Sequence, residues 1–324
     1  MNKQTILLAG AGPMAIEYAK VLKKLRKEFV VVGRGKQSAT QFEKTTGIKP
    51  SIGGLEDYLS KNNFPIQEAI IAVSEDQLGT VAIKLIQYGV KSILIEKPGG
   101  SSFEDIKTVA TKAGVSKTKI FVAYNRRFYS SVAEAREIIK KDGGVLSLHF
   151  EFTEIADRIT PLKKAPGVKE NWLMHNSSHV IDLAFFLGGQ PKIFSAYIKG
   201  RLPWHPKASV FAGAGITENN AIFSYQANWE APGRWGIEIL TKNKRLILKP
   251  LEKLQVQKKG SFEISEVSLD NQVDIDFKPG LYKQVKAFLD SKQNYTAKIT
   301  LLCTIAEQAG NLNFYKKILE GYHA

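Results

Sequence analysis

The sequence of 324 residues contains a single cysteine, Cys303, so no disulfide bond can form within the chain. It also lacks any apolar run near the roughly 20 residues that a membrane-spanning helix needs. The apolar segment Ile6–Ala9 is too short for the core of a secretion signal, and no small-residue cleavage pattern follows it. These absences predict a cytoplasmic protein with no membrane partner, in which Cys303 packs in a core rather than acting as a nucleophile.

Acidic residues are outnumbered, because 46 lysines and arginines accompany 31 aspartates and glutamates and give a formal net charge of +15. Such a charge suits nucleic acid, an acidic membrane surface or a polyanionic small substrate. The basic residues are scattered along the chain, and no basic segment is interleaved with aromatic residues. We therefore predict a solvated basic surface that attracts phosphorylated ligands, and no nucleic-acid partner.

Short apolar runs alternate with amphipathic segments through the first 123 residues. This alternation predicts a parallel sheet with helices on both faces. The predicted strands are Ile6–Ala9, Phe29–Val32, 69–73, Ser92–Ile95 and 120–123, and the helices between them are 15–26, 38–46, Leu55–Lys61, 79–88 and 103–113. The sequence therefore predicts a first α/β domain over residues 1–123.

From residue 124 the pattern changes to β-rich runs with few helical segments. Such runs are typical of a mostly antiparallel open sheet, so we predict a second, α+β domain over residues 124–324. Its predicted strands are 145–153, 193–199, 209–212, 220–228, 235–241, 245–248, 254–258 and 262–268. Its predicted helices are 131–140, 171–187, 282–290 and 300–318.

The first strand runs directly into a Gly-x-Gly-x-x-Ala turn formed by Gly10, Gly12 and Ala15. Gly10 permits the tight turn, Gly12 lets a pyrophosphate approach the backbone, and Ala15 lets the helix lie close to the strand. The helix begins at Pro13, which has no N–H, and the unpaired N–H groups that follow from Met14 favour an anion, as does the helix dipole. The turn predicts a Rossmann-type dinucleotide site that includes all five residues.

The end of the second strand reads Val32-Gly33-Arg34-Gly35-Lys36-Gln37-Ser38 and holds no carboxylate. A NAD-specific site of this type usually has Asp or Glu here to bond the ribose hydroxyls. A guanidinium binds a 2′-phosphate in a forked geometry, so Gly33, Arg34 and Ser38 predict a preference for NADP(H), with NAD(H) as the alternative. Arg34 could equally stack on adenine or face water.

The fourth strand, Ser92–Ile95, runs into Glu96-Lys97-Pro98-Gly99. Ligands of open α/β sheets bind beyond the carboxyl ends of the strands, and Pro98 stiffens this turn. A lysine there could hydrogen-bond a substrate hydroxyl or carbonyl group. We predict Glu96 and Lys97 as cofactor-binding residues and Lys97 also as a catalytic and substrate-binding residue.

On these motifs the chain resembles the Gfo/Idh/MocA oxidoreductases, the family of glucose–fructose oxidoreductase and inositol dehydrogenase. The resemblance extends over the whole chain and rests on Gly10-Ala11-Gly12-Pro13-Met14-Ala15, Glu96-Lys97-Pro98, Tyr124-Asn125-Arg126-Arg127-Phe128 and His175-Asn176-Ser177-Ser178-His179-Val180-Ile181-Asp182. It implies an N-terminal Rossmann domain, a C-terminal domain whose large open sheet forms a homodimer or homotetramer interface, and hydride transfer between NAD(P) and a sugar or cyclitol carbon.

The family often carries Asp-x-x-x-His-x-x-Asp where this chain has His175, His179 and Asp182. These three positions share one face of a helix. The resemblance implies that His179 is the general acid and base, a role that suits imidazole. His175 replaces the first carboxylate and either binds substrate or assists proton transfer, while Asp182 either orients neighbouring groups or bonds the backbone. Two histidines without an adjacent glutamate or a third ligand predict no metal site.

Further site residues follow from their place in the chain. By resemblance, Asn125 and Arg127 lie beside the nicotinamide. An interdomain hinge with arginines on its surface would give the same sequence pattern. Ser74, where the family often has a Thr-Pro-Asn sequence, contacts the cofactor. Trp172 and Asn176, together with Lys97, His175 and His179, are the predicted substrate-binding residues.

The sequence therefore predicts an NADP(H)-dependent oxidoreductase that transfers hydride to or from a sugar carbon. Lys163, Lys164 and Lys169 near Trp172 point towards a phosphorylated or nucleotide-linked keto sugar, with free sugars and cyclitols as alternatives. A second hypothesis is a cofactor-binding regulatory protein of the same fold without turnover, motivated by His175. A third is a NAD-dependent cyclitol or sugar dehydrogenase.

Overall fold

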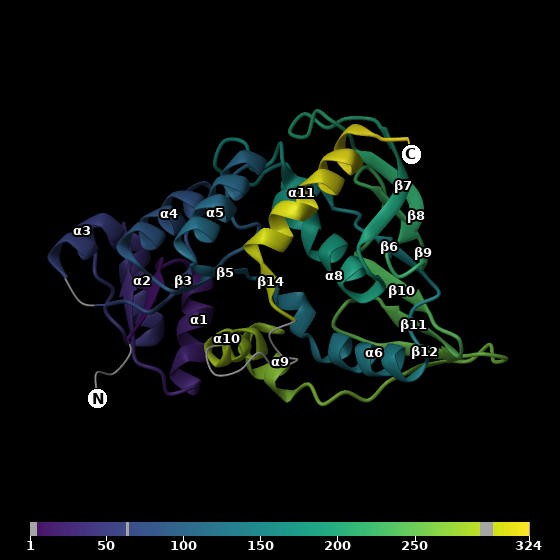
Figure 1. Ribbon diagram of the computed structural model, residues 1–324, viewed down its shortest axis with the longest axis horizontal. Helices are drawn as coiled ribbons and strands as arrows, with labels where there is room; N and C mark the ends of the chain where they lie inside the picture. Colours follow the sequence, from purple (N-terminus) through teal and green to yellow (C-terminus); the bar gives the residue numbers. More distant parts are fainter. Residues whose placement is uncertain (1–4, 63–64, 292–300, 324) are drawn as a thin grey trace. The chain divides into compact units, whose positions relative to one another are not determined.

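The computed structural model describes residues 5–62, 65–291 and 301–323, and its elements are labelled in Figure 1. The chain forms two compact units. The first comprises Met1–Tyr124 and Asp276–Gly310, and the second comprises Asn125–Ile275 and Asn311–Ala324. The chain thus leaves the first unit after residue 124 and returns to it at residue 276. The predicted single boundary at residue 123 does not include this return.

The first unit is built on a six-stranded sheet in the order β14-β5-β4-β3-β1-β2. Five strands are parallel, namely β1 (Ile6–Ala9), β2 (Phe29–Val32), β3 (Glu68–Ile71), β4 (Ser92–Ile95) and β5 (Lys119–Val122). The central strands β1, β3 and β4 are buried along their whole length, as expected when helices cover both faces of a parallel sheet. The predicted Rossmann-type fold is confirmed.

The helices of this sheet follow the predicted alternation, with starts and ends that differ by a few residues. They are α1 (Pro13–Lys24), α2 (Lys36–Thr46), α3 (Leu55–Lys61), the short 3-10 helix η1 (Glu75–Gln77), α4 (Leu78–Tyr88) and α5 (Phe103–Ser116). The hydroxyl of Ser102 accepts a hydrogen bond from the backbone N–H of Asp105 and so caps α5. Gly47 and Gly89 end α2 and α4 in the left-handed conformation that glycine favours.

The returning segment completes the first unit. Helix α10 (Leu281–Asp290) packs on α1, and the two-residue strand β14 (Cys303–Thr304) pairs antiparallel with β5. Helix α11 (Ile305–Glu320) starts directly after β14. The prediction of a helix from residue 300 is therefore wrong over Cys303–Thr304, because these residues extend the sheet; residue 300 itself lies outside the described part. Cys303 is buried, as predicted.

The second unit is built on an eight-stranded sheet in the order β13-β12-β11-β10-β6-β9-β8-β7. Its strands are β6 (Ser147–Glu151), β7 (Pro191–Lys199), β8 (Val210–Thr217), β9 (Ile222–Asn228), β10 (Gly236–Leu240), β11 (Lys244–Leu248), β12 (Gln255–Lys258) and β13 (Ile264–Glu266). Every neighbouring pair is antiparallel except β6 and β9. The predicted mostly antiparallel sheet is confirmed.

One face of this sheet carries the core of the second unit. Phe150 of β6 packs edge-on against Phe185 of α8 (Ser178–Gly188), with 5.4 Å between ring centroids, and stacks on Tyr225 of β9. The other face leaves Tyr197, Ile216 and Ile222 exposed. The remaining helices are η2 (Asn125–Phe128), α6 (Ser130–Lys141), α7 (Ala156–Ile159), the π-helix η3 (Leu173–Ser177) and α9 (Gln272–Asp276).

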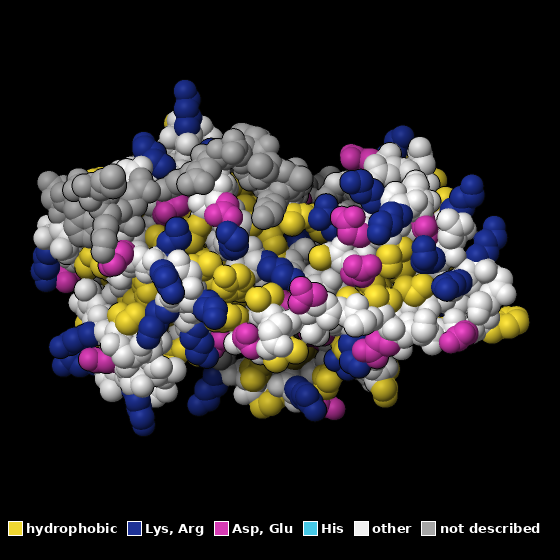
Figure 2. All heavy atoms as spheres, turned by 90° about the horizontal axis from the view of Figure 1, so that it is seen from below, with side chains coloured by type: hydrophobic (Ala, Val, Ile, Leu, Met, Phe, Trp, Pro, Cys, Tyr) yellow, Lys and Arg dark blue, Asp and Glu magenta, His cyan; other side chains and the backbone are white. Residues whose placement is uncertain are grey.

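The outer surface carries the positive charge in a dispersed form. Figure 2 shows Lys and Arg side chains spread over the face drawn, with acidic side chains among them. Within the described residues, no helix combines the length and the apolar character that crossing a bilayer demands.

Candidate functional site

The turn between β1 and α1 has the geometry of a phosphate-binding loop. Gly10 has φ of +117°, and a Cβ there would lie 2.2 Å from the carbonyl oxygen of Ala72, so only glycine fits. A Cβ on Gly12 would instead meet no atom within 4 Å, so the space in front of the turn is open. Pro13 is the first residue of α1, and no side chain caps the helix. The position of a Gly12 side chain is thus unoccupied and the N–H groups that follow Pro13 have no side-chain cap, as a phosphate-binding turn requires.

The end of β2 places Arg34 near an acidic residue that the sequence did not indicate. The hydroxyl of Ser74 donates a hydrogen bond to Asp76, and this bond and the nearby charge of Arg34 lower the pKa of Asp76. The hydroxyl of Ser38 donates to the carbonyl of Gly35 at 3.1 Å. Arg34 is exposed and Asp76 belongs to η1, so the loops after β2 and β3 place opposite charges at one edge of the sheet.

Glu96 and Lys97 follow β4 at the same edge of the sheet. The hydroxyl of Tyr18 in α1 donates a 2.7 Å hydrogen bond to Glu96. Burial raises the pKa of Glu96, while the bond from Tyr18 and the charges of Lys97 and Lys278 oppose this rise. Glu96 is thereby fixed to helix α1, which begins directly after the glycine turn.

The loop that carries Lys97 is anchored by a residue from far along the chain. The side-chain amide of Gln308 donates to the carbonyl of Pro98 at 3.0 Å, and its amide oxygen accepts a bond from the hydroxyl of Tyr124. Gln308 is fully buried in the first turns of α11. It therefore holds the backbone beside Lys97, and no local pattern in the sequence indicates this role.

In the second unit, the two predicted histidines lie on two consecutive helical segments of different type. His175 belongs to the π-helix η3, and His179 belongs to the α-helix α8 that continues it. Both are almost completely buried, at 2% and 6% exposure. A π-helical turn changes the angular spacing of side chains, and such turns are frequent at functional sites.

Glu154 follows strand β6 and accepts hydrogen bonds from side chains of the π-helix η3. Both of its carboxylate oxygens accept bonds from the side-chain amide of Asn176, at 3.0 and 3.1 Å, and one accepts from Ser177 at 2.7 Å. Glu154 is 7% exposed. Asn176, predicted to bind substrate, thus has its amide nitrogen directed at Glu154, a carboxylate that the sequence analysis missed because it lies 22 residues away.

Asp182 forms a buried ion pair with Arg127. The Nε of Arg127 lies 2.8 Å from one carboxylate oxygen and its Nη2 lies 2.5 Å from the other, a forked arrangement. The guanidinium carbon also lies 4.7 Å from the ring centroid of Phe186. Of the two roles left open for Asp182, the structure shows the orientation of a neighbouring group, and that group is Arg127.

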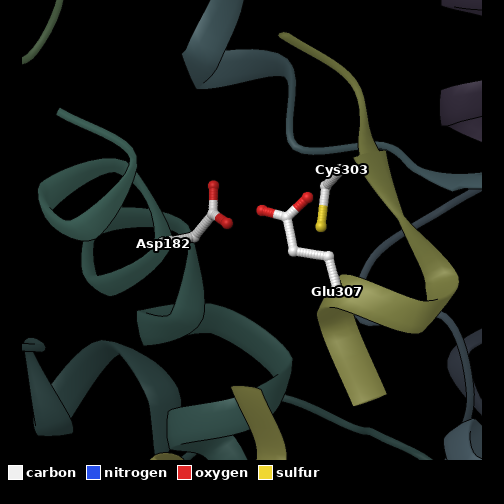
Figure 3. Close-up of side chains that lie close together, drawn as sticks. All are labelled: Asp182, Cys303 and Glu307. Atoms are coloured by element: carbon white, nitrogen blue, oxygen red, sulfur yellow. The ribbon is translucent and has the colours of Figure 1, made fainter. Parts of the chain in front are cut away.

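Figure 3 draws Asp182 on α8, and Cys303 and Glu307 on β14 and α11. Asp182 belongs to the second unit, whereas Cys303 and Glu307 belong to the first. Both carboxylate oxygens of Asp182 already accept hydrogen bonds from Arg127. A cation at Asp182 would have to compete with a guanidinium, so the pair gives no support for a metal ligand there.

Trp172 is buried in an aromatic cluster. Its ring packs edge-on against Trp204 at 6.1 Å, and Trp204 stacks on Trp229 at 5.8 Å. Only 7% of Trp172 is exposed. The described environment of this predicted substrate residue is therefore mainly that of a core side chain.

Arg126 and Trp235 form a further polar and aromatic pair that was not among the predicted site residues. The guanidinium of Arg126 lies 4.8 Å from the ring centroid of Trp235, and the ring of His179 lies 6.2 Å from that of Trp235. Arg126 and Trp235 both line a cavity of about 220 Å³ in the second unit. Arg126 occurs within the motif Tyr124 to Phe128, but the sequence does not tell which of its two arginines turns towards a cavity.

These features define a class of protein: a Rossmann-type dinucleotide-binding unit joined to a unit with a large open sheet. Residues 5–124 match the family model GFO_IDH_MocA, described as an oxidoreductase family with an NAD-binding Rossmann fold. This match covers the N-terminal region and confirms the predicted resemblance to the Gfo/Idh/MocA oxidoreductases. The family match also supports the prediction that the protein is an enzyme.

Several solved structures share the fold over almost the whole chain. An oxidoreductase from Agrobacterium radiobacter in complex with NAD⁺, L-tartaric acid and magnesium is 15% identical, with a TM-score of 0.78 and coverage of 98% of this chain and 96% of that chain. Levoglucosan dehydrogenase in complex with NADH and L-sorbose is 18% identical, with a TM-score of 0.77 and coverage of 99% and 96%.

A third similar structure is UDP-N-acetylglucosamine 3-dehydrogenase GnnA from Acidithiobacillus ferrooxidans, which is 14% identical, with a TM-score of 0.75 and coverage of 99% of both chains. No curated protein matches the chain. At these identities the solved structures show that the whole chain, including the second unit, has the fold of these proteins.

The buried ion pair generates a stability prediction. Replacing Asp182 by Asn removes the negative charge that accepts two hydrogen bonds from the buried guanidinium of Arg127, so we expect the free energy of unfolding to fall by about 3–5 kcal/mol. Urea denaturation followed by circular dichroism measures this change. Asp290→Asn is the matched control, because Asp290 forms an exposed pair with Lys286 at 3.0 Å and should change stability by less than about 1 kcal/mol. Equal and small effects of the two substitutions would contradict the importance of the buried pair.

Proposed function

We propose that this protein is an NADP(H)-dependent oxidoreductase that transfers hydride to or from a sugar carbon. The observation that carries the proposal is the open space in front of Gly12 at the start of α1, which fits a dinucleotide. The family match supports an oxidoreductase, and the similar structures include dehydrogenases of sugars. In this proposal the first unit binds the cofactor, the second binds the substrate, and a cytoplasmic location follows from the single cysteine.

We propose specific roles for residues of both units. A bound nicotinamide supplies or accepts the hydride. In the reducing direction His179 donates a proton to the developing alkoxide oxygen, and Lys97 stabilises the negative charge on that oxygen. In the oxidising direction His179 accepts the proton of the substrate hydroxyl. His175 assists this transfer or binds substrate, and Glu96 and Asn125 bind the nicotinamide half of the cofactor.

Preference for NADP(H) rests on Arg34, because no carboxylate follows β2 and the guanidinium is exposed there. Asp76 lies close enough to Arg34 for the charge of Arg34 to lower the pKa of Asp76. A 2′-phosphate, with about two negative charges, would attract the guanidinium more strongly than this single exposed carboxylate does. NAD(H) is the alternative cofactor.

Replacing Arg34 by Ala should test this preference directly. We expect the Kd for NADPH to rise about tenfold and the Kd for NADH to stay within about twofold, since only NADPH carries the 2′-phosphate. Isothermal titration calorimetry measures both values. Lys44→Ala removes an equal charge from the last turn of α2 and serves as the control, for which neither Kd should change. If the unmodified protein binds NADH tenfold more tightly than NADPH, the preference is refuted.

The proposed chemistry is tested by following nicotinamide absorbance with sugars, keto sugars, cyclitols and nucleotide-linked sugars. With a substrate found in this way, we expect Lys97→Ala and His179→Ala each to lower kcat/KM at least about 100-fold. His179→Ala should leave the Kd for NADPH within about twofold, because His179 is assigned to substrate chemistry. The control Lys192→Ala, on an exposed residue of β7, should leave kcat/KM unchanged.

The second candidate function is a cofactor-binding regulatory protein without turnover. The observation that favours it is His175, within the π-helix η3, in place of the family's carboxylate. Tight NADPH binding together with the absence of any sugar that oxidises NADPH would establish this candidate in place of the dehydrogenase.

We propose a phosphorylated or nucleotide-linked keto sugar as the substrate, with simple sugars and cyclitols as alternatives. The lysines near Trp172 support this choice only weakly. Lys163 and Lys164 are exposed, and the ammonium group of Lys169 donates to the backbone carbonyl of Thr160 at 2.7 Å. Their charge is available to a phosphate group only at the surface, where salt screens it.

We also propose a homo-oligomer, a dimer or tetramer, formed through the open face of the second unit's sheet. That face exposes apolar side chains on adjacent strands, including Tyr197 of β7, Ile216 of β8 and Ile222 of β9. Ile216 lies opposite Ile222 on one side and opposite the exposed Ile193 of β7 on the other, so these three side chains lie side by side and offer an apolar surface to a second copy.

Ile222→Arg tests this interface. We expect multi-angle light scattering to give the mass of a dimer or tetramer for the unmodified protein and a monomer for Ile222→Arg, because a charge at the centre of an apolar interface is costly to bury. Ile275→Arg changes an equally exposed isoleucine in α9, away from the sheet, and should keep the oligomer. A monomeric unmodified protein would refute the proposal.

A further inference from the structure

A lysine from the later part of the chain lies at the start of α1. The ammonium group of Lys278 lies 2.9 Å from the sulfur of Met14, which is the second residue of this helix. The two residues are 264 positions apart in the sequence, and both belong to the first unit. Lys278 therefore reaches the helix because the chain returns to the first unit at residue 276.

The turn that carries Lys278 is held against the helices of the first unit. Its backbone carbonyl accepts a 3.0 Å hydrogen bond from the N–H of Leu281, the first residue of α10, and α10 packs on α1 (Figure 1). The rings of Phe277 and Tyr282 pack together across this turn, with 5.3 Å between their centroids. The backbone of Lys278 is thus fixed near the start of α1, while its side chain is exposed.

A carboxylate near Lys278, that of Glu96, is shared with a second lysine. Burial raises the pKa of Glu96, whereas the 2.7 Å hydrogen bond from Tyr18 lowers it. The charges of Lys97 and Lys278 also lower this pKa, so both ammonium groups lie near the one carboxylate. Together the three charged groups carry an excess positive charge even when Glu96 is ionised.

The contact between Lys278 and Met14 satisfies the ammonium group poorly. A thioether sulfur is a weak acceptor, and the N-terminus of a helix carries a partial positive charge that repels a cation. The first turn of α1, which the structure describes in full, contains no acidic residue that would offset this repulsion. An anion bound at the N-terminus of α1 would attract the ammonium group and the helix end alike, and the pyrophosphate of a dinucleotide is such an anion.

We infer that Lys278 binds the pyrophosphate of the dinucleotide cofactor, together with the backbone N–H groups that follow Pro13. The inference rests on the proposed function, because it assumes that a dinucleotide occupies the glycine turn. Lys278 then acts on NADPH and NADH alike, since both contain the pyrophosphate. Arg34, in contrast, is assigned to the 2′-phosphate that only NADPH contains, so the contributions of the two cations can be measured separately.

Calorimetric titration of the full chain with NADPH, NADH and ADP-ribose tests this inference. ADP-ribose contains the same pyrophosphate but neither the nicotinamide nor the 2′-phosphate. In Lys278→Met, which keeps an unbranched side chain and removes its charge, we expect the Kd of each of the three ligands to rise about five- to tenfold. Lys278→Arg keeps the charge, so each Kd should stay within about twofold of its value in the unmodified protein.

Lys286→Met is the matched control. Lys286 lies on α10 and forms an exposed pair with Asp290, so this variant removes an equal charge from the surface of the first unit. Each Kd should stay within about twofold, and the thermal unfolding midpoint of each variant confirms that it is folded. The inference is overturned if Lys278→Met leaves the Kd values unchanged, if it weakens NADPH alone, if Lys286→Met weakens binding equally, or if none of the three ligands binds the unmodified protein.

The readout separates this inference from the proposed reaction. Binding of all three ligands that depends on Lys278, in a protein that never oxidises NADPH with any sugar, would uphold the pyrophosphate contact and refute the dehydrogenase. Turnover of a sugar by a protein whose Kd values do not depend on Lys278 would uphold the dehydrogenase and refute the pyrophosphate contact.

Discussion

The buried ion pair between Arg127 and Asp182 is the constraint on which the second unit's site depends. Side chains that are about 2% and 1% exposed lose their hydration, and only a forked, two-bond geometry compensates for that loss. The pair fixes the η2 turn to the helix α8 that carries His179. Because η2 is a tight 3-10 turn, the preceding side chain, Arg126, points in a different direction and lines the cavity. One arginine thus holds the scaffold, while its neighbour lies 4.8 Å from the Trp235 ring and lines the cavity.

Much of the fold could be predicted from the sequence because its signals are local. The strands Ile6–Ala9, Phe29–Val32 and Ser92–Ile95 have the predicted bounds, since each strand of this parallel sheet is a short apolar run between turn residues. The antiparallel character of the second sheet was also predicted. The two-residue strand Cys303–Thr304 was not predicted. It is extended because it pairs with Phe121 and Val122, which are far away in the sequence.

The candidate site was predictable in part for the same reason. The glycine turn is a local motif, and its geometry at Gly10 and Gly12 fits the predicted role. Glu154 and Gln308 were missed because each acts through a hydrogen bond to a residue more than 20 positions away. Two adjacent arginines look alike in a sequence, and which one becomes buried depends on where an aspartate 55 residues later comes to lie.

The charge of the chain and the charge of the cavity act at different ranges. Lysines and arginines scattered over the surface, as in Figure 2, raise the concentration of any anion near the protein, but salt screens them beyond about 8–10 Å. They therefore do not distinguish one anionic sugar from another. Arg126, half-buried and 4.8 Å from the Trp235 ring, acts only over contact distances and adds nothing specific to this long-range field. A net charge of +15 would thus account for capture of an anionic ligand but not for its orientation.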